Sequence, residues 1–257
     1  ALGANVTGTR NTGLGSNSLK ASTANDNTGC GATALFTNTS GTKNTAVGSQ
    51  AMYYNETGDN NTGLGYDALQ DNTTGSDNTA VGALALDQNT TASNNTAVGK
   101  AALGTNTTGA GNTAVGGNAL DSSTTADENT GIGYLALEAN STGQYNTAVG
   151  ARALDANTTA NNNTAIGRLA LSANTTGASN VAVGANALDA NTTGEQLTSV
   201  GYQSLSANTT ANFNTAIGYN SLLNNTTGAN NTAIGRAALT LNTTAYDNNA
   251  VGKDALL

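Results

Sequence analysis

The sequence predicts an all-β fold, a parallel β-solenoid (β-roll) of about fifteen coils of 17 residues. The motif N-T-A-V-G and its variants return every 17 residues from Gly48 to Gly252, and self-similarity at a fixed short period is typical of repeat architectures. The chain has 32 glycines and no proline, which indicates tight turns at fixed places. Only 37% of its residues are hydrophobic, too few for an ordinary globular core of this length.

The coils are numbered here from the asparagine of N-T-A-V-G, so that Asn44 to Asn60 is one coil with positions 1 to 17. The period slips only between Gly15 and Gly31, where one residue is missing. Because the repeat runs from end to end, we expect a single β-solenoid domain over residues 1–257, with no linker and no evident capping coil.

Each coil is expected to hold two short strands. N-T-A-V alternates sides with period two and stops at the glycine of position 5, and x-A-L at positions 7 to 9 follows as a second strand. Turns fall at that glycine and at N-T-T-G, whose residues bond locally or accept unusual dihedral angles. A single coil cannot bury its apolar side, so we expect coils to stack at about 4.8 Å each.

Two columns are predicted to form the core of this stack, with glycines at the turn. Position 4 is always apolar and mostly β-branched, and position 9 is almost always leucine. If both point inward, they form two continuous apolar stripes. The predicted core residues are Val47, Val81, Val98, Val115 and Val149 with Leu69, Leu103, Leu120, Leu154 and Leu188, and the predicted turn glycines are Gly48, Gly82, Gly99, Gly116 and Gly150.

Small residues form two further columns, at positions 3 and 8, as in Ala148 and Ala153. With valine inward, strand alternation sends position 3 outward and creates a flat strip of methyl groups. That strip predicts a homo-oligomer, most simply a parallel trimer packed through the alanines. Equally, alanine and glycine fit a cramped coil interior, and the sequence leaves both interpretations open.

Asparagines recur at positions 1 and 12. Stacked amides can hydrogen-bond from coil to coil and so satisfy polar groups without a large core. Alternatively, N-T-T at position 12 matches the acceptor sequence for N-glycosylation. The candidate glycosylation sites are Asn72, Asn89, Asn106, Asn157, Asn174, Asn191, Asn208, Asn225 and Asn242.

Composition argues against several function classes. The chain has no histidine, which rules out a histidine-based catalytic triad or metal site. Its net charge of -8 and lack of a basic patch argue against nucleic acid, and no apolar run approaches the roughly 20 residues of a membrane helix. Cys30 occupies the position-4 column, where we expect a buried thiol. We therefore expect no enzyme activity, no metal and no cofactor.

The repeated "NTAVGxxAL" with "NTTG" resembles the repeats of bacterial and phage fibre proteins of the tail-fibre type. It is also similar to the "SVAIGxxA" head repeats of trimeric autotransporter adhesins. The resemblance implies a secreted trimeric β-roll fibre on the surface of a cell or virion, which carries a binding tip or adheres to a host surface or matrix ligand.

Three function classes follow. The leading one is a structural subunit or shaft of an extracellular fibre, including a phage tail fibre, with copies of itself as partners, joined head to tail through uncapped ends or side by side. The second is ice binding through threonine or asparagine columns; against it, threonines such as Thr79 and Thr96 alternate in step with valine, so we expect them inside. The third, carbohydrate binding, has little support because the chain has no tryptophan and its variable surface positions show no constellation of binding residues.

Overall fold

The structure is a computed structural model that describes residues 2, 3, 5 and 7–256, and it confirms the predicted fold class. The described residues form no helix, and each coil contributes one strand of three residues. The strands are β1 (Thr12–Leu14), β2 (Thr28–Cys30), β3 (Thr45–Val47), β4 (Thr62–Leu64), β5 (Thr79–Val81), β6 (Thr96–Val98), β7 (Thr113–Val115), β8 (Thr130–Ile132), β9 (Thr147–Val149), β10 (Thr164–Ile166), β11 (Val181–Val183), β12 (Thr198–Val200), β13 (Thr215–Ile217), β14 (Thr232–Ile234) and β15 (Asn249–Val251).

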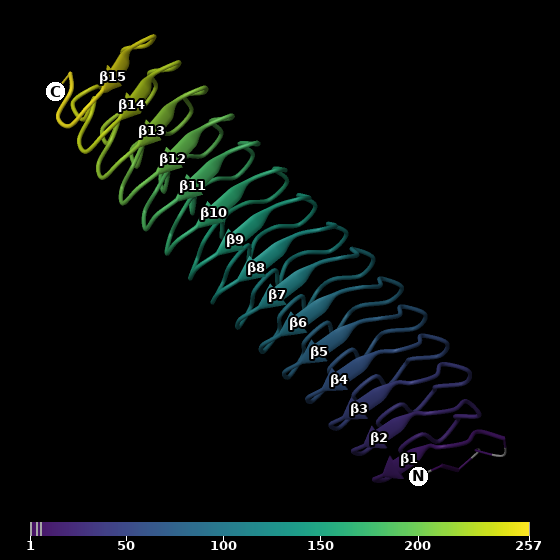
Figure 1. Cartoon of the computed structure of the whole chain (residues 1–257). Coiled ribbons are helices and arrows are strands. Elements are labelled where there is room, and N and C mark those ends of the chain that lie inside the picture. Colours follow the sequence, from purple (N-terminus) through teal and green to yellow (C-terminus); the bar gives the residue numbers. More distant parts are fainter. Residues whose placement is uncertain (1, 4, 6, 257) are drawn as a thin grey trace. The chain divides into compact units, whose positions relative to one another are not determined.

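The chain forms two compact units, Ala1–Glu128 with β1 to β7 and Asn129–Leu257 with β8 to β15. Within each unit, consecutive strands pair in parallel and in chain order (Figure 1). Equivalent positions pair, as Thr79 does with Thr96 and Val81 with Val98. The single domain over residues 1–257 stays a prediction, and the first and last residues lie outside the described part of the chain.

The second predicted strand of each coil is wrong. Adjacent residues at positions 8 and 9, such as Ala102 and Leu103, are both fully buried, whereas a strand sends neighbours to opposite sides. The backbone achieves this with left-handed dihedral angles at position 9, for example φ of 52° at Leu103. The segment still bonds to the next coil, since the Leu103 N–H donates to the Ala119 carbonyl at 3.0 Å.

The leucine stripe of the core is confirmed. Its members are fully buried and stack from coil to coil within each unit, and each contributes about 1.5–3 kcal/mol of transfer free energy. Met52 takes the same place in its coil and is equally buried. The predicted leucines with no exposed surface are Leu69, Leu103, Leu120, Leu154 and Leu188.

The valine stripe of the core is wrong, because position 3 rather than position 4 faces inward. Ala80 and Ala97 have no exposed surface, whereas Val98 is 36% exposed. The interior beside the leucines has space only for a methyl group or less: a Cβ on Gly63, at position 3, would lie 3.1 Å from the Met52 side chain. The valines that lie outside the core, half-buried or exposed, are Val47, Val81, Val98, Val115 and Val149.

The predicted alanine strip on the surface is therefore wrong as well. Ala148, at position 3, and Ala153, at position 8, are both fully buried. The alternative interpretation, that small residues fit a cramped coil interior, is confirmed. A trimer packed through these alanines loses its predicted contact surface.

The turn glycines at position 5 are confirmed by their backbone conformation. At Gly99, φ is +139°, a region that residues with a Cβ rarely adopt. A Cβ there would also lie 2.4 Å from the Gly116 carbonyl oxygen of the next coil. Coil spacing thus depends on glycine at this position. The predicted glycines that all have positive φ are Gly48, Gly82, Gly99, Gly116 and Gly150.

Candidate functional site

The asparagines of position 12 form a ladder of amides along the inside of each unit. The Nδ2 of Asn89 donates to Asn72 Oδ1 in the previous coil at 2.8 Å and to the Ala92 carbonyl of its own coil at 3.0 Å. Its Oδ1 accepts from Asn106 Nδ2 at 3.0 Å. Because Asn89 is fully buried, each of these bonds satisfies a group that water cannot reach.

The asparagines of position 1 form a second ladder, this time to the backbone. Asn61 Oδ1 accepts from the Asn78 N–H at 2.9 Å, and Asn78 Nδ2 donates to the Ala92 carbonyl at 2.9 Å. The carbonyl of position 15 therefore accepts from both asparagine columns of its coil. The predicted hydrogen bonding of stacked amides is confirmed, and this shared acceptor explains why the N-T-T-G turn follows each buried leucine.

Glycans on position 12 are incompatible with this fold, so that prediction is wrong for the folded chain. The acceptor nitrogen would be Nδ2, which donates inward to protein atoms. Eight of the nine candidates are fully buried and the ninth, Asn242, is half-buried. The corrected residues are Asn72, Asn89, Asn106, Asn157, Asn174, Asn191, Asn208, Asn225 and Asn242.

The outward side chains of positions 2 and 4 form what we call the strand face of each unit. In the first unit it holds seven threonines at position 2 and seven apolar residues at position 4, one of each on every strand from β1 to β7. In the second unit position 2 is threonine except at Val181 and Asn249. The expectation that Thr79 and Thr96 point inward is wrong, and the objection to ice binding falls with it.

Threonine hydroxyls have different partners in different columns. At position 13, Thr73 and Thr90 donate to the carbonyl of the next coil at 2.9 and 3.0 Å. In the described strands, no hydrogen bond joins a position-2 hydroxyl such as that of Thr96 to a protein atom. The position-2 hydroxyls are therefore available to water or to a ligand.

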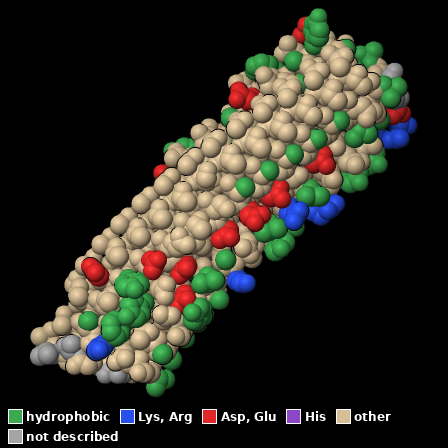
Figure 2. All heavy atoms as spheres, turned by 180° about the vertical axis from the view of Figure 1, so that it is seen from behind, with side chains coloured by type: hydrophobic (Ala, Val, Ile, Leu, Met, Phe, Trp, Pro, Cys, Tyr) green, Lys and Arg blue, Asp and Glu red, His purple; other side chains and the backbone are tan. Residues whose placement is uncertain are grey.

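Charged side chains stand beside the strand face rather than on it. Positions 2 and 4 carry none in the described strands, whereas the flanking positions 17 and 6 include Lys43, Asp77 and Lys100. Figure 2 shows a face of the molecule on which most atoms belong to backbone or uncharged polar side chains, with acidic side chains scattered among them. The positions that are constant from coil to coil are therefore uncharged, and the charged side chains occur at positions that vary.

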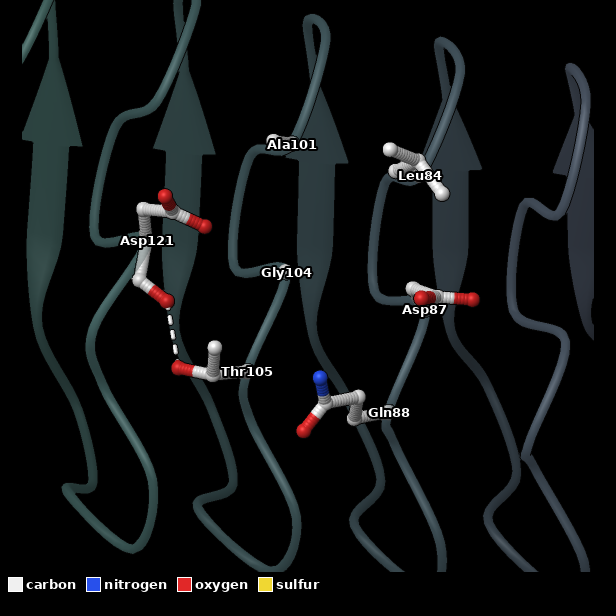
Figure 3. Close-up of a pocket in the computed structure, with 7 residues that line it drawn as sticks. All are labelled: Leu84, Asp87, Gln88, Ala101, Gly104, Thr105 and Asp121. Atoms are coloured by element: carbon white, nitrogen blue, oxygen red, sulfur yellow. Dashed lines mark hydrogen bonds between the residues drawn. The ribbon is translucent and has the colours of Figure 1, made fainter.

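A hollow of about 140 Å³ lies in the first unit where Gly104 provides no side chain between Asp87 and Asp121 at position 10 of the neighbouring coils (Figure 3). Asp87 Oδ1 is buried without a hydrogen-bond partner. Burial, and next the charges of Asp71 and Asp67, raise the pKa of Asp87 to about 6. The hollow is too small for an organic substrate, and two carboxyl groups on its rim do not make a catalytic constellation with an identified role.

Cys30 lies on the strand face at position 4 of β2, half-buried and without a disulfide. The prediction of a buried thiol is wrong for the same reason as the valine stripe. Among the described residues, no group of three or more Cys, Asp or Glu side chains is placed to hold a metal ion. The described part of the chain also contains no helix of the length and apolarity needed to cross a membrane.

The chain matches no protein-family model and no curated protein. The strand face, whose positions 2 and 4 the sequence interpretation placed inside, is the feature that it missed. The signal for it was present in the sequence: position 3 never holds a residue larger than serine, as expected of a buried position with little space.

Proposed function

We propose that the chain is a structural subunit of an extracellular surface fibre, in which the solenoid is a shaft. The observation that carries this proposal is the pair of asparagine ladders, which tie successive coils together through buried side chains. Such bonds fix the spacing and orientation of each coil relative to the next. These amide hydrogen bonds keep successive coils in a regular stack, and amide groups of this kind are not chemically reactive.

The surface chemistry supports the same function. The side chains that are constant from coil to coil are uncharged, and the variable ones are scattered over the exposed positions. A shaft needs regular coils and a soluble surface, and the net charge of -8 supplies repulsion between chains in solution. The resemblance to fibre repeats points to the surface of a cell or a virion. Lateral assembly of parallel copies stays a prediction, with a contact surface other than the alanines.

Immunogold labelling of unpermeabilised source cells and of particles shed from them tests the location. Label on surface fibres supports the proposal, and label confined to the cell interior overturns it.

Stretching of single chains by force spectroscopy tests the shaft. If the ladders hold coils one to the next, the chain lengthens in steps of one coil, roughly 60 Å for 17 extended residues. The Asn89→Ala variant, which removes one amide from a ladder, is expected to unravel first at that coil. A featureless extension at low force would contradict a load-bearing role.

A further inference from the structure

In the described strands, no side-chain hydrogen bond accounts for the constancy of position 2 on the strand face. Inside the coils, repetition follows from packing, since each alanine, leucine or asparagine contacts its own counterpart in the next coil. On the strand face, the hydroxyls of Thr62, Thr79 and Thr96 have no protein partner, yet threonine occupies position 2 on all seven strands of the first unit. A uniform column of unbonded hydroxyls with an aliphatic row in register beside it suits a partner with the same repeat.

We propose that the strand face of each unit binds ice, with the threonine hydroxyls and methyl groups of position 2 and the aliphatic groups of position 4 as the contact atoms. The occupant is the crystalline water lattice itself. This activity goes beyond a structural role and does not depend on it.

The repeat along the stack matches the spacing of ordered water. Two water molecules bonded to a common third at the tetrahedral angle lie about 4.5 Å apart, given oxygen–oxygen hydrogen bonds of about 2.75 Å. Parallel strands repeat at about 4.8 Å. The drift of about 0.3 Å per coil lets several successive threonines meet one row of the lattice before the two fall out of step.

The face is also regular and, in the described strands, uncharged. Parallel register places Thr79 beside Thr96 and Val81 beside Val98, so that positions 2 and 4 form two straight rows about 6.6 Å apart. The β-branched side chains of both rows have restricted χ1 angles, so little freedom is lost when they are fixed against a surface. Many weak contacts then act together because they are carried by one hydrogen-bonded sheet in each unit.

A second copy of the chain fits the same face less well. In a dry interface, the free hydroxyls of one copy would lie against the aliphatic row or the hydroxyls of the other, and unpaired buried hydroxyls are unfavourable. Ice instead offers a donor or acceptor to each hydroxyl and voids that can receive the methyl groups.

Position 14 holds a second exposed threonine column, which includes Thr91 and Thr108. It lies at the N-T-T turn outside the sheet, and it is a single row without an aliphatic row in register beside it. It therefore serves as the matched comparison for the strand face.

The test measures thermal hysteresis and partition into a growing ice hemisphere for the full chain. One variant carries lysine for threonine on the strand face, at positions 79, 96, 164 and 215, and the other carries it at position 14 of the same coils, at 91, 108, 176 and 227. Both sets change the net charge equally, and thermal unfolding checks that both variants fold.

We expect hysteresis and ice partition in the wild-type chain, loss of both in the strand-face variant and retention of both in the position-14 variant. No hysteresis and no partition in the wild-type chain overturns the proposal. So does loss in the position-14 variant alone. A wild-type oligomer that dissociates in the strand-face variant, without any ice activity, would assign the face to a second copy and overturn it as well.

Discussion

The buried asparagine columns and the outer threonine column are equally regular, but only the first is explained by contacts within the chain. Asn89 exchanges side-chain hydrogen bonds with Asn72 and Asn106, so its repetition is a condition of stacking. Thr96 lies on the strand face, and no hydrogen bond joins its hydroxyl to a protein atom. Side-chain hydrogen bonds therefore do not account for its repetition.

The difference teaches that regularity in a solenoid has two origins. Inside, each column must fit its own copy at a fixed spacing, so residue identity follows from volume and hydrogen bonding. Outside, no contact of this kind holds a column constant, and positions 6 and 17 do vary from coil to coil. Stability measurements separate the two, because inner changes should be costly and outer changes nearly neutral.

The largest effect is expected at the glycine turn. Gly99→Ala places a Cβ 2.4 Å from the Gly116 carbonyl oxygen at a φ of +139°, so the coils must separate. We expect a loss of about 4 kcal/mol in the free energy of unfolding, measured by urea denaturation. Gly104→Ala is the matched control, because its Cβ would approach closely only the end of the Asp121 side chain, at 2.7 Å, and would meet the Ala101 carbonyl at an ordinary contact distance of 3.4 Å. Equal losses in the two variants would contradict a special role for position 5.

The next effect compares the two apolar columns. Leu103→Ala removes a fully buried side chain and leaves a cavity, with an expected loss of about 3 kcal/mol. Val98→Ala changes a residue that is already 36% exposed, with an expected loss below about 1 kcal/mol. Urea denaturation of both variants measures the difference. A larger loss for Val98→Ala would restore the valine stripe to the core.

A smaller effect compares the two polar columns. Asn89→Ala leaves Asn72 Oδ1 and one Asn106 Nδ2 hydrogen without partners in the interior, and we expect a loss of about 2 kcal/mol. Thr96→Val keeps the shape of an outer side chain and removes only an unbonded hydroxyl, so a change within about 0.5 kcal/mol is expected. Thermal unfolding of the two variants at one pH is sufficient. A similar loss in both would show that the outer column also supports the stack.

The sequence predicted the period, the parallel solenoid, the leucine stripe, the turn glycines and the amide ladders, because each depends on one residue type at one spacing. The sequence interpretation placed the wrong side of T-A-V inward, although the small residues at position 3 carried the signal. Alternation allows two phases, and hydrophobicity favours Val98 inside over Ala97. The small space beside the position-9 side chains, seen where Gly63 faces Met52, decides the reverse.

The left-handed backbone at Leu103 was equally hidden, because leucine is not a residue type that signals positive φ. The wrong assignment of which strand residues face inward also affected the prediction of the candidate site. As a result, the threonines of the strand face were predicted to lie inside, and the buried alanines were predicted to form a contact surface.

The smallest expected effect on stability comes from Asp87, a half-buried residue. Asp87 is half-buried at the edge of the Gly104 hollow, and burial, followed by the charges of Asp71 and Asp67, raises its pKa from 3.8 to about 6. The folded chain therefore binds this proton more tightly than the unfolded chain. Its stabilising contribution is complete below about pH 3.8 and is lost as the pH rises through about 6.

Asp87→Asn removes this titration. We expect the free energy of unfolding of the wild-type chain to fall relative to the variant between pH 4 and about pH 6, by a modest amount because solvent reaches the group. Asp71→Asn removes one of the two negative charges that raise the pKa, so the fall should move to lower pH. Urea denaturation across this range measures all three chains. Parallel profiles for the wild type and Asp87→Asn would show that Asp87 is solvated like an outer residue. Position 10 would then belong with the outer columns.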